Sequence, residues 1–99
     1  EDIYEMIEYF ASRNKILYVH FRNVSAPNPN EFNEEFINTG YVDMVKAMKI
    51  YKDAGFEGCF MDDHCPDIYN DQEFPGNLGG YRSRIFAQGY IQGLLDSIN

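Results

Sequence analysis

The chain has 99 residues and a formal net charge of −8, with 16 Asp and Glu against 8 Lys and Arg. This acidic balance argues against nucleic acid and anionic membrane surfaces as partners, because both require clustered Lys and Arg. A hydrophobic fraction of 44% predicts a folded protein. The apolar runs are far shorter than the ~20 residues of a membrane span, so we expect no membrane association.

Two further features bound the class of protein. Cys59 and Cys65 form neither a disulfide framework nor a zinc-finger spacing, which predicts a reducing cytoplasm. The sequence begins at Glu1 without an initiator methionine, and a helical pattern starts at once. We therefore expect residues 1–99 to be one segment of a larger domain, to be completed by the remainder of that domain or by another chain.

The first half of the chain predicts a helix, a strand and a loop. Apolar residues recur at helical spacing over 3–11 with acids on the opposite face, which indicates an amphipathic helix ending near 13–14. An apolar run over 16–21 predicts a buried strand. Residues 24–38 carry two prolines and several asparagines, a composition typical of a long irregular loop.

The second half repeats this order. Helical spacing over 41–54 predicts a helix with Asn38 or Thr39 as N-cap and Gly55 at its end. A strand over 57–61 follows.

An irregular stretch over 65–80 and a helix over 81–98 complete the chain. In that last helix Gly89 and Gly93 lie four residues apart, which favours close packing against a neighbouring element because glycine is otherwise unfavourable in helices. The predicted order is α-β-α-β-α. Long strand-to-helix connections and short helix-to-strand connections are typical of α/β barrels whose active site lies at one rim.

Residues with metal-binding or acid/base chemistry follow both strands. Alternation places Tyr18, His20 and Arg22 on one face of the first strand, opposite Leu17, Val19 and Phe21.

The second strand leads into Asp63 and His64. Parallel strands joined by a crossover helix end at the same rim, so we expect His20 and Asp63 to lie close together. Imidazole and carboxylate suit Mn²⁺, Fe²⁺ or Zn²⁺. A hydrogen-bonded core histidine and a turn aspartate are the structural alternatives.

Other side chains have a chemical and a structural interpretation. His64 suits general acid/base work near a metal, or faces solvent. Arg22 could hold a substrate carboxylate, or form a salt bridge. Tyr81, at the start of the last helix, could reach an anionic substrate, or pack the rim. Arg82 and Arg84 in the same turn suggest a partner carboxylate, because the helix dipole disfavours cations there.

The remaining candidates have mainly structural interpretations. We expect Cys59 to be a small buried hydrophobe, and we disfavour Cys65 as nucleophile or ligand because no ordered base accompanies it. Asp62, Asp67 and Asp71 are expected to be solvated acids, since an EF-hand spacing is missing.

Several segments together resemble the mannonate dehydratase family: Val19-His20-Phe21-Arg22-Asn23, Asn38-Thr39-Gly40-Tyr41-Val42-Asp43-Met44, the Asp63-His64 pair and Gly80-Tyr81-Arg82-Ser83-Arg84. The resemblance covers nearly the whole chain and matches the C-terminal part of that family. It implies that residues 1–99 are the C-terminal β/α units of a single TIM-type (β/α)8 barrel of the xylose isomerase-like kind. The Asp62-Asp63-His64-Cys65-Pro66 stretch departs in its flanks from the family's usual sequence, in which a basic residue and a proline precede the Asp-His pair.

The resemblance also implies an activity. The family removes water from D-mannonate, a sugar acid, to give 2-dehydro-3-deoxy-D-gluconate in hexuronate breakdown, with Mn²⁺ or Fe²⁺ as cofactor. On this basis His20 and Asp63 are metal ligands, and His64 and Tyr81 are catalytic. We also expect Arg22 to bind substrate, from its place beside His20, and the full-length protein to be a homo-oligomer. The family's other ligands, a histidine and a cysteine, come from earlier strands, so we expect residues 1–99 alone to be inactive.

Two alternatives stay open at this point. A sugar isomerase or epimerase on the same barrel would use similar ligands, although with carboxylates in the acid/base role. A noncatalytic acidic binding module with the same α-β-α-β-α order would have a melting temperature that does not change when Mn²⁺ or Fe²⁺ is added.

Overall fold

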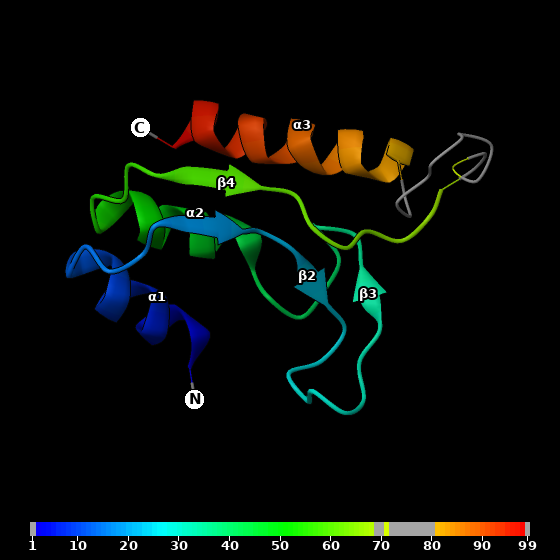
Figure 1. Cartoon of the computed structure of the whole chain (residues 1–99), viewed down its shortest axis with the longest axis horizontal. Coiled ribbons are helices and arrows are strands. Elements are labelled where there is room, and N and C mark those ends of the chain that lie inside the picture. The colour runs from blue at the N-terminus through cyan, green and yellow to red at the C-terminus, as the bar shows by residue number, and fades with distance from the viewer. Residues whose placement is uncertain (1, 69–70, 72–80, 99) are drawn as a thin grey trace.

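The structure is a computed structural model that describes residues 2–68, 71 and 81–98. Three helices and four short strands make up the described residues, arranged in space as Figure 1 shows. Their bounds are α1 (Ile3–Ser12), β1 (Tyr18–His20), β2 (Asn23–Val24), β3 (Glu34–Glu35), α2 (Met44–Asp53), β4 (Cys59–Met61) and α3 (Tyr81–Ser97). The predicted α-β-α-β-α order is therefore present, with β2 and β3 inserted between β1 and α2.

Local signals explain how the first two helices begin and end. Asp2 caps α1 by accepting a hydrogen bond from the Tyr4 N–H at 2.8 Å. After α2, Gly55 has φ of +84°, the left-handed conformation that ends many helices, as the sequence predicts. The predicted N-cap of α2 is wrong, because Asp43 rather than Asn38 or Thr39 accepts a hydrogen bond from the Lys46 N–H at 3.0 Å.

Strands β1 and β4 pair in parallel, and α2 lies on the crossover between them. The register places Tyr18 opposite Cys59 and His20 opposite Met61. Beyond the strands, the Phe21 N–H donates to the Met61 carbonyl at 2.8 Å. This β-α-β arrangement brings the carboxyl ends of both strands to one edge of the molecule.

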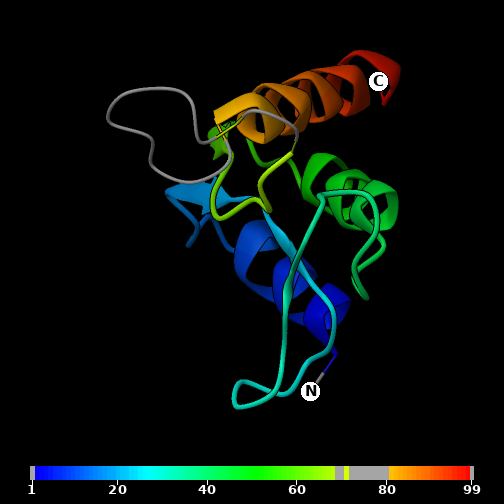
Figure 2. The same cartoon turned by 90° about the vertical axis from the view of Figure 1, so that its right-hand side faces the viewer.

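The helices cover one face of this sheet. Figure 2 shows α1, α2 and α3 on the same side of β1 and β4. Val19 and Phe21 from β1 and its extension are buried beneath them, and Phe21, Tyr51, Phe56 and Phe60 form edge-to-face and tilted ring contacts with centroids 5.2 to 6.5 Å apart. The core therefore lies between the sheet and the helices, as expected of an α/β unit.

The opposite face of the sheet is open. Tyr18 is 57% exposed and Met61 47% exposed, and Cys59 is also exposed, so the expectation that Cys59 is buried is wrong. Leu17, predicted to share the buried face, lies before β1 and is 86% exposed. Parallel sheets are normally covered on both faces, so this face is a place where further structure is expected to pack.

The loop prediction for 24–38 is partly wrong. Val24 pairs with Glu34 and Asn23 with Glu35 in an antiparallel ladder, β2 with β3. These strands are too short to show an alternating pattern in the sequence. The hairpin projects from the carboxyl end of β1 (Figure 2), so its residues adjoin the predicted site.

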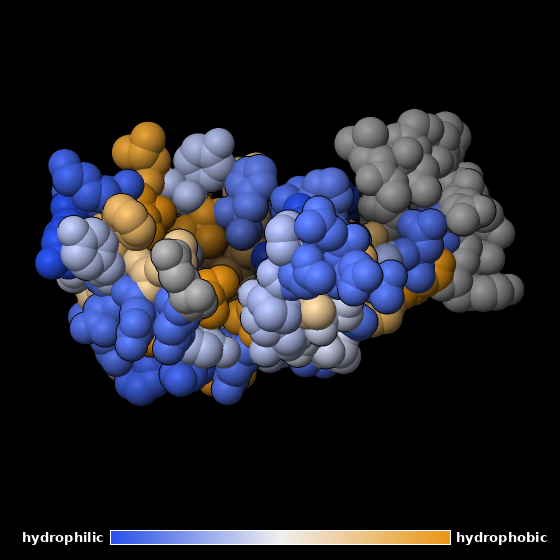
Figure 3. All heavy atoms as spheres, turned by 90° about the horizontal axis from the view of Figure 1, so that it is seen from below, coloured by the Kyte–Doolittle hydropathy of each residue, from blue (hydrophilic) through white to orange (hydrophobic). Residues whose placement is uncertain are grey.

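The predicted packing role of Gly89 and Gly93 is also not observed. A Cβ atom built on either residue meets no atom within 4 Å among the described residues. Apolar surface instead gathers on the half of the molecule that carries α1 and the start of β1 (Figure 3), where Met6, Phe10 and Leu17 are exposed.

Candidate functional site

The carboxyl ends of β1 and β4 bring His20 and Asp63 into contact. Nδ1 of His20 lies 3.3 Å from Oδ2 of Asp63, with side-chain exposures of 49% and 22%. The two residues are separated by more than forty positions in the sequence, and the parallel pairing of β1 with β4 is what joins them. The predicted juxtaposition of His20 and Asp63 is confirmed.

Arg22 lies beside the same carboxylate. Its Nη1 is 3.4 Å from Asp63 Oδ2, and its Nη2 is 3.3 Å from Oε1 of Glu34 on β3. Arg22 therefore forms the salt bridge that was its structural alternative, while its binding of substrate stays a prediction. Glu34 was missed by the sequence analysis, because it lies in a stretch without periodicity and only the hairpin brings it to the site.

His64 completes the cluster. Its Nε2 lies 3.6 Å from Asp63 Oδ1, and its side chain is 60% exposed. Partial burial raises the pKa of Asp63, but the neighbouring groups lower it by a larger amount, so that the pKa lies below its usual value. These groups are the backbone N–H and the charge of His64 and the hydrogen-bonding side chains of His20 and Arg22. Asp63 is therefore an ionised carboxylate at neutral pH, able to bind a cation.

The donor set fits a divalent ion in part. Two ligand atoms each about 2.1 Å from one ion are separated by roughly 3.0 to 3.4 Å in octahedral or tetrahedral geometry. The 3.3 Å between His20 Nδ1 and Asp63 Oδ2 falls in this range. Within the described residues, however, no group of three or more His, Cys, Asp or Glu side chains could hold a metal ion. His20 and Asp63 supply part of a site only.

The start of α3 differs from the prediction. Asp71 is 1% exposed and accepts hydrogen bonds from the backbone N–H groups of Ile68, at 2.7 Å, and Arg82. Burial opposes its ionisation, but these hydrogen bonds and that from the Ser83 backbone lower the pKa of Asp71. The expectation that Asp71 is a solvated acid is wrong, because its carboxylate is buried and accepts hydrogen bonds from the backbone at the start of α3.

Arg84 has the carboxylate partner that its position suggested. Its Nη1 lies 2.9 Å from Oδ2 of Asp62, which also accepts a hydrogen bond from Gln88 at 3.0 Å through Oδ1. Asp62 is thus a structural acid rather than a solvated one. The side chain of Tyr81 and residues Gly79 and Gly80 lie outside the described residues, so the prediction for Tyr81 is not tested.

Cys65 is not a reactive thiol in this structure. Its Sγ donates to the Asp63 carbonyl at 3.1 Å, and burial raises the pKa of the thiol above its usual value, despite a lowering contribution from Ser83. A raised pKa keeps the thiol protonated at neutral pH, which makes it a poor nucleophile or metal ligand. This agrees with the low expectation for Cys65.

Asn23 fixes the backbone behind Arg22. The side chain is 1% exposed and donates to the Ile37 and Val42 carbonyls at 3.1 and 2.8 Å. Its Oδ1 accepts from the Val24 and Val42 N–H groups at 3.0 and 3.1 Å. One buried amide thereby ties the hairpin to the segment before α2, and so sets where Glu34 lies.

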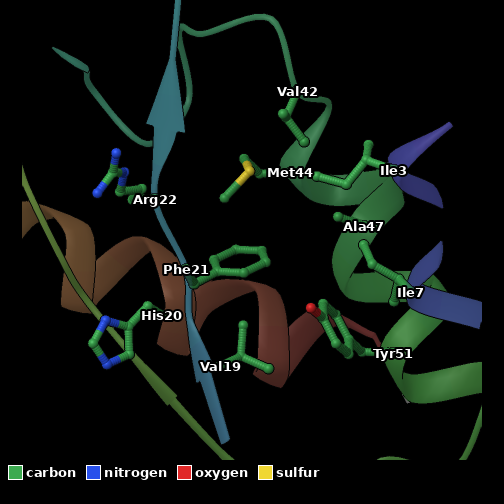
Figure 4. Close-up of a pocket in the computed structure, with 10 residues that line it drawn as sticks. All are labelled: Ile3, Ile7, Val19, His20, Phe21, Arg22, Val42, Met44, Ala47 and Tyr51. Carbon is green, nitrogen blue, oxygen red and sulfur yellow. The ribbon is translucent and has the colours of Figure 1, made fainter. Parts of the chain in front are cut away.

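A small cavity lies on the other side of β1. It measures about 80 Å³ and is lined mainly by apolar side chains from β1, α1 and α2. Figure 4 shows Val19 and Phe21 directed into this space, while His20 and Arg22 point away on the far side of the strand. Ligand pockets usually measure about 300 to 1,000 Å³, so this cavity is a gap in the core packing.

Comparison with known proteins shows consistent similarity along the chain. The sequence profile of the family described as D-mannonate dehydratase (UxuA) matches residues 1–99. A mannonate dehydratase 2 of Halalkalibacterium halodurans is 31% identical over 99% of this chain and 28% of its own length. A mannonate dehydratase of Brachyspira hyodysenteriae is 35% identical over 87% of this chain and 24% of its own length.

A solved structure agrees with these sequences. The crystal structure of mannonate dehydratase from Streptococcus suis serotype 2 aligns with a TM-score of 0.82 and 32% identity, over 97% of this chain and 28% of that one. The chain thus spans about a quarter of the length of the relatives it matches. Among the described residues, every helix is too short or too polar to traverse a lipid bilayer.

Proposed function

The chain belongs to the D-mannonate dehydratase family, and from this premise we propose that it contributes part of the active site for dehydration of D-mannonate to 2-dehydro-3-deoxy-D-gluconate. The observation that carries the proposal is the meeting of His20, Arg22, Asp63 and His64 at the carboxyl ends of β1 and β4. In α/β barrels this end of the strands carries the active site. The segment would form consecutive β/α units of a TIM-type barrel, whose other strands would cover the open face of β1 and β4.

The reaction requires two proton transfers. A proton leaves the carbon next to the carboxylate, and hydroxide leaves the following carbon and departs as water. His64 lies within reach of Asp63 and is 60% exposed, so it could exchange a proton with a substrate held there. Tyr81 is proposed as its partner on family resemblance. Arg22 would orient the substrate carboxylate through its planar fork of donors.

His20 and Asp63 would hold a divalent ion, for which Mn²⁺ or Fe²⁺ suits the nitrogen and oxygen donors. When bound, that ion would polarise substrate oxygens and stabilise the charge that develops as hydroxide leaves. Two ligands hold a metal weakly, so residues 1–99 alone are expected not to turn over mannonate. We further propose a cytoplasmic location, where the free thiols of Cys59 and Cys65 would stay reduced, and a homo-oligomeric full-length form.

The test is an assay of the protein as its gene encodes it, with Mn²⁺ and D-mannonate. We expect a product that has lost the mass of water, and we expect activity to disappear after chelation and return with Mn²⁺. His64→Gln should lower kcat by roughly 10² to 10⁴-fold while Mn²⁺ affinity is kept, because only proton transfer is removed.

Lys49→Gln is the matched control. Lys49 forms an exposed pair with Asp53 on α2, away from the cluster, and its loss should leave kcat unchanged. A product of unchanged mass would instead indicate an isomerase or epimerase. Full activity of His64→Gln would remove His64 from the proposed acid/base role.

A further inference from the structure

A single oxygen atom at the site has two competing partners. Oδ2 of Asp63 lies 3.3 Å from His20 Nδ1 and 3.4 Å from Arg22 Nη1. A divalent ion held between His20 and Asp63 would approach this same oxygen. Because Arg22 is permanently charged, its guanidinium both occupies the oxygen and repels the incoming cation.

Arg22 is also held from the other side. Its Nη2 lies 3.3 Å from Glu34 Oε1, and the Arg22 and Glu34 side chains are 32% and 30% exposed, which limits screening by solvent. The second oxygen of Glu34, Oε2, is buried and accepts no hydrogen bond from the described residues. Glu34 therefore has an acceptor to spare, and a carboxylate can bind both Nη atoms of one arginine.

We infer that Arg22 competes with the divalent cation for Asp63, and that Glu34 is a positioning residue that weakens this competition by drawing Arg22 toward β3. When Asp63 holds a cation, Nη1 of Arg22 would be free to turn to Oε2 of Glu34, which would complete a bidentate pair. The released guanidinium face then becomes available to a substrate carboxylate. The inference rests on the proposed metal site. It adds that the position of the β2–β3 hairpin, which carries Glu34, affects how tightly the cation binds.

This arrangement predicts opposite effects for the two members of one ion pair. In Arg22→Gln the competitor is removed, so Mn²⁺ should bind about fivefold more tightly. In Glu34→Gln Arg22 keeps Asp63 as its main partner, so Mn²⁺ should bind about fivefold more weakly. A purely structural role of the ion pair would instead weaken binding in both variants.

The charges of Arg22 and Glu34, acting on the cation from a distance, would also shift the Mn²⁺ affinity in opposite directions. The double variant distinguishes this explanation from a contact between the two side chains. If Glu34 acts through Arg22, adding Glu34→Gln to Arg22→Gln should change the Mn²⁺ affinity by less than about twofold. If Glu34 acts only by its charge, the same fivefold loss should appear in both backgrounds. Glu35→Gln is the matched control, since it removes an equal charge from the neighbouring position of β3, and it should change the affinity by about twofold or less.

The measurement is a titration of free Mn²⁺ by electron paramagnetic resonance, on the encoded protein without substrate, with circular dichroism to verify folding. The inference is supported if the single variants shift the Mn²⁺ affinity in opposite directions and Glu34→Gln has almost no effect in the Arg22→Gln background. Shifts of the same sign, or an equal effect of Glu34→Gln in both backgrounds, overturn it while leaving the proposed dehydratase function standing. If the wild-type protein binds no Mn²⁺, both the metal site and this inference fail.

Discussion

Single buried or half-buried side chains determine the geometry around the site. Asn23 is the clearest case, because its amide makes hydrogen bonds to backbone groups of Val24, Ile37 and Val42. The closeness of His20 and Asp63 could be predicted from sequence, since it depends only on parallel pairing of two recognisable strands. The roles of Asn23 and Glu34 could not, since both depend on contacts across a hairpin without a sequence pattern.

We predict that Asn23→Ala destabilises the protein by about 3 kcal/mol, because buried N–H and C=O groups lose their partners. Asn23→Asp should not restore stability, since a carboxylate cannot donate to the Ile37 and Val42 carbonyls that the amide serves. The midpoint of urea unfolding measures both effects. Asn38→Ala, at an exposed position, is the control and should shift stability by less than about 0.5 kcal/mol. An unchanged midpoint for Asn23→Ala would show that the hairpin is held by other contacts.

At the scale of elements, periodicity predicted the helices and the paired strands β1 and β4, with ends displaced by a few residues. The α1 pattern over 3–11 corresponds to Ile3–Ser12, and the 41–54 pattern to Met44–Asp53. The hairpin was missed because Asn23–Val24 and Glu34–Glu35 are too short to alternate, and their pairing depends on the buried Asn23 side chain. Local composition, with prolines and asparagines, favours a loop there.

The glycines of α3 give a test at this scale. Because a Cβ atom at Gly89 meets nothing within 4 Å in the described part of the chain, Gly89→Ala should stabilise residues 1–99 by about 0.5 to 1 kcal/mol through higher helix propensity. At Gly40 the same change would make Cβ overlap the side-chain amide of Asn23 and lie 2.6 Å from the Val24 carbonyl oxygen, so Gly40→Ala should destabilise the protein.

Thermal unfolding of the two variants measures the contrast. If Gly89→Ala instead lowers stability when the protein is studied as encoded, another element packs against α3 at this position. That outcome would restore the interpretation that the four-residue spacing of Gly89 and Gly93 first suggested.

On the scale of the whole molecule, one face of the β1–β4 sheet is covered and the other is open. An open face is expected of a chain that spans only about a quarter of the length of its relatives. The helices cover one face of β1 and β4, and Tyr18, Cys59 and Met61 remain exposed on the other. Within the described residues no further strand pairs with the outer edges of β1 and β4. Open edges and an uncovered apolar face favour association with other chains.

We therefore predict that residues 1–99, expressed alone, form species larger than the 11.5 kDa monomer in light scattering coupled to size-exclusion chromatography. Met61→Lys should shift the population toward monomer, because it places a charge in the open face of the sheet. Val45→Lys on α2 is the matched control: Val45 is 48% exposed and Met61 47%, yet Val45 lies away from that face. If both variants shift the population toward monomer equally, association is driven by exposed apolar surface in general and not by the open face of the sheet. If neither does and the wild type is monomeric, the open face of β1 and β4 is stable in water without a covering element.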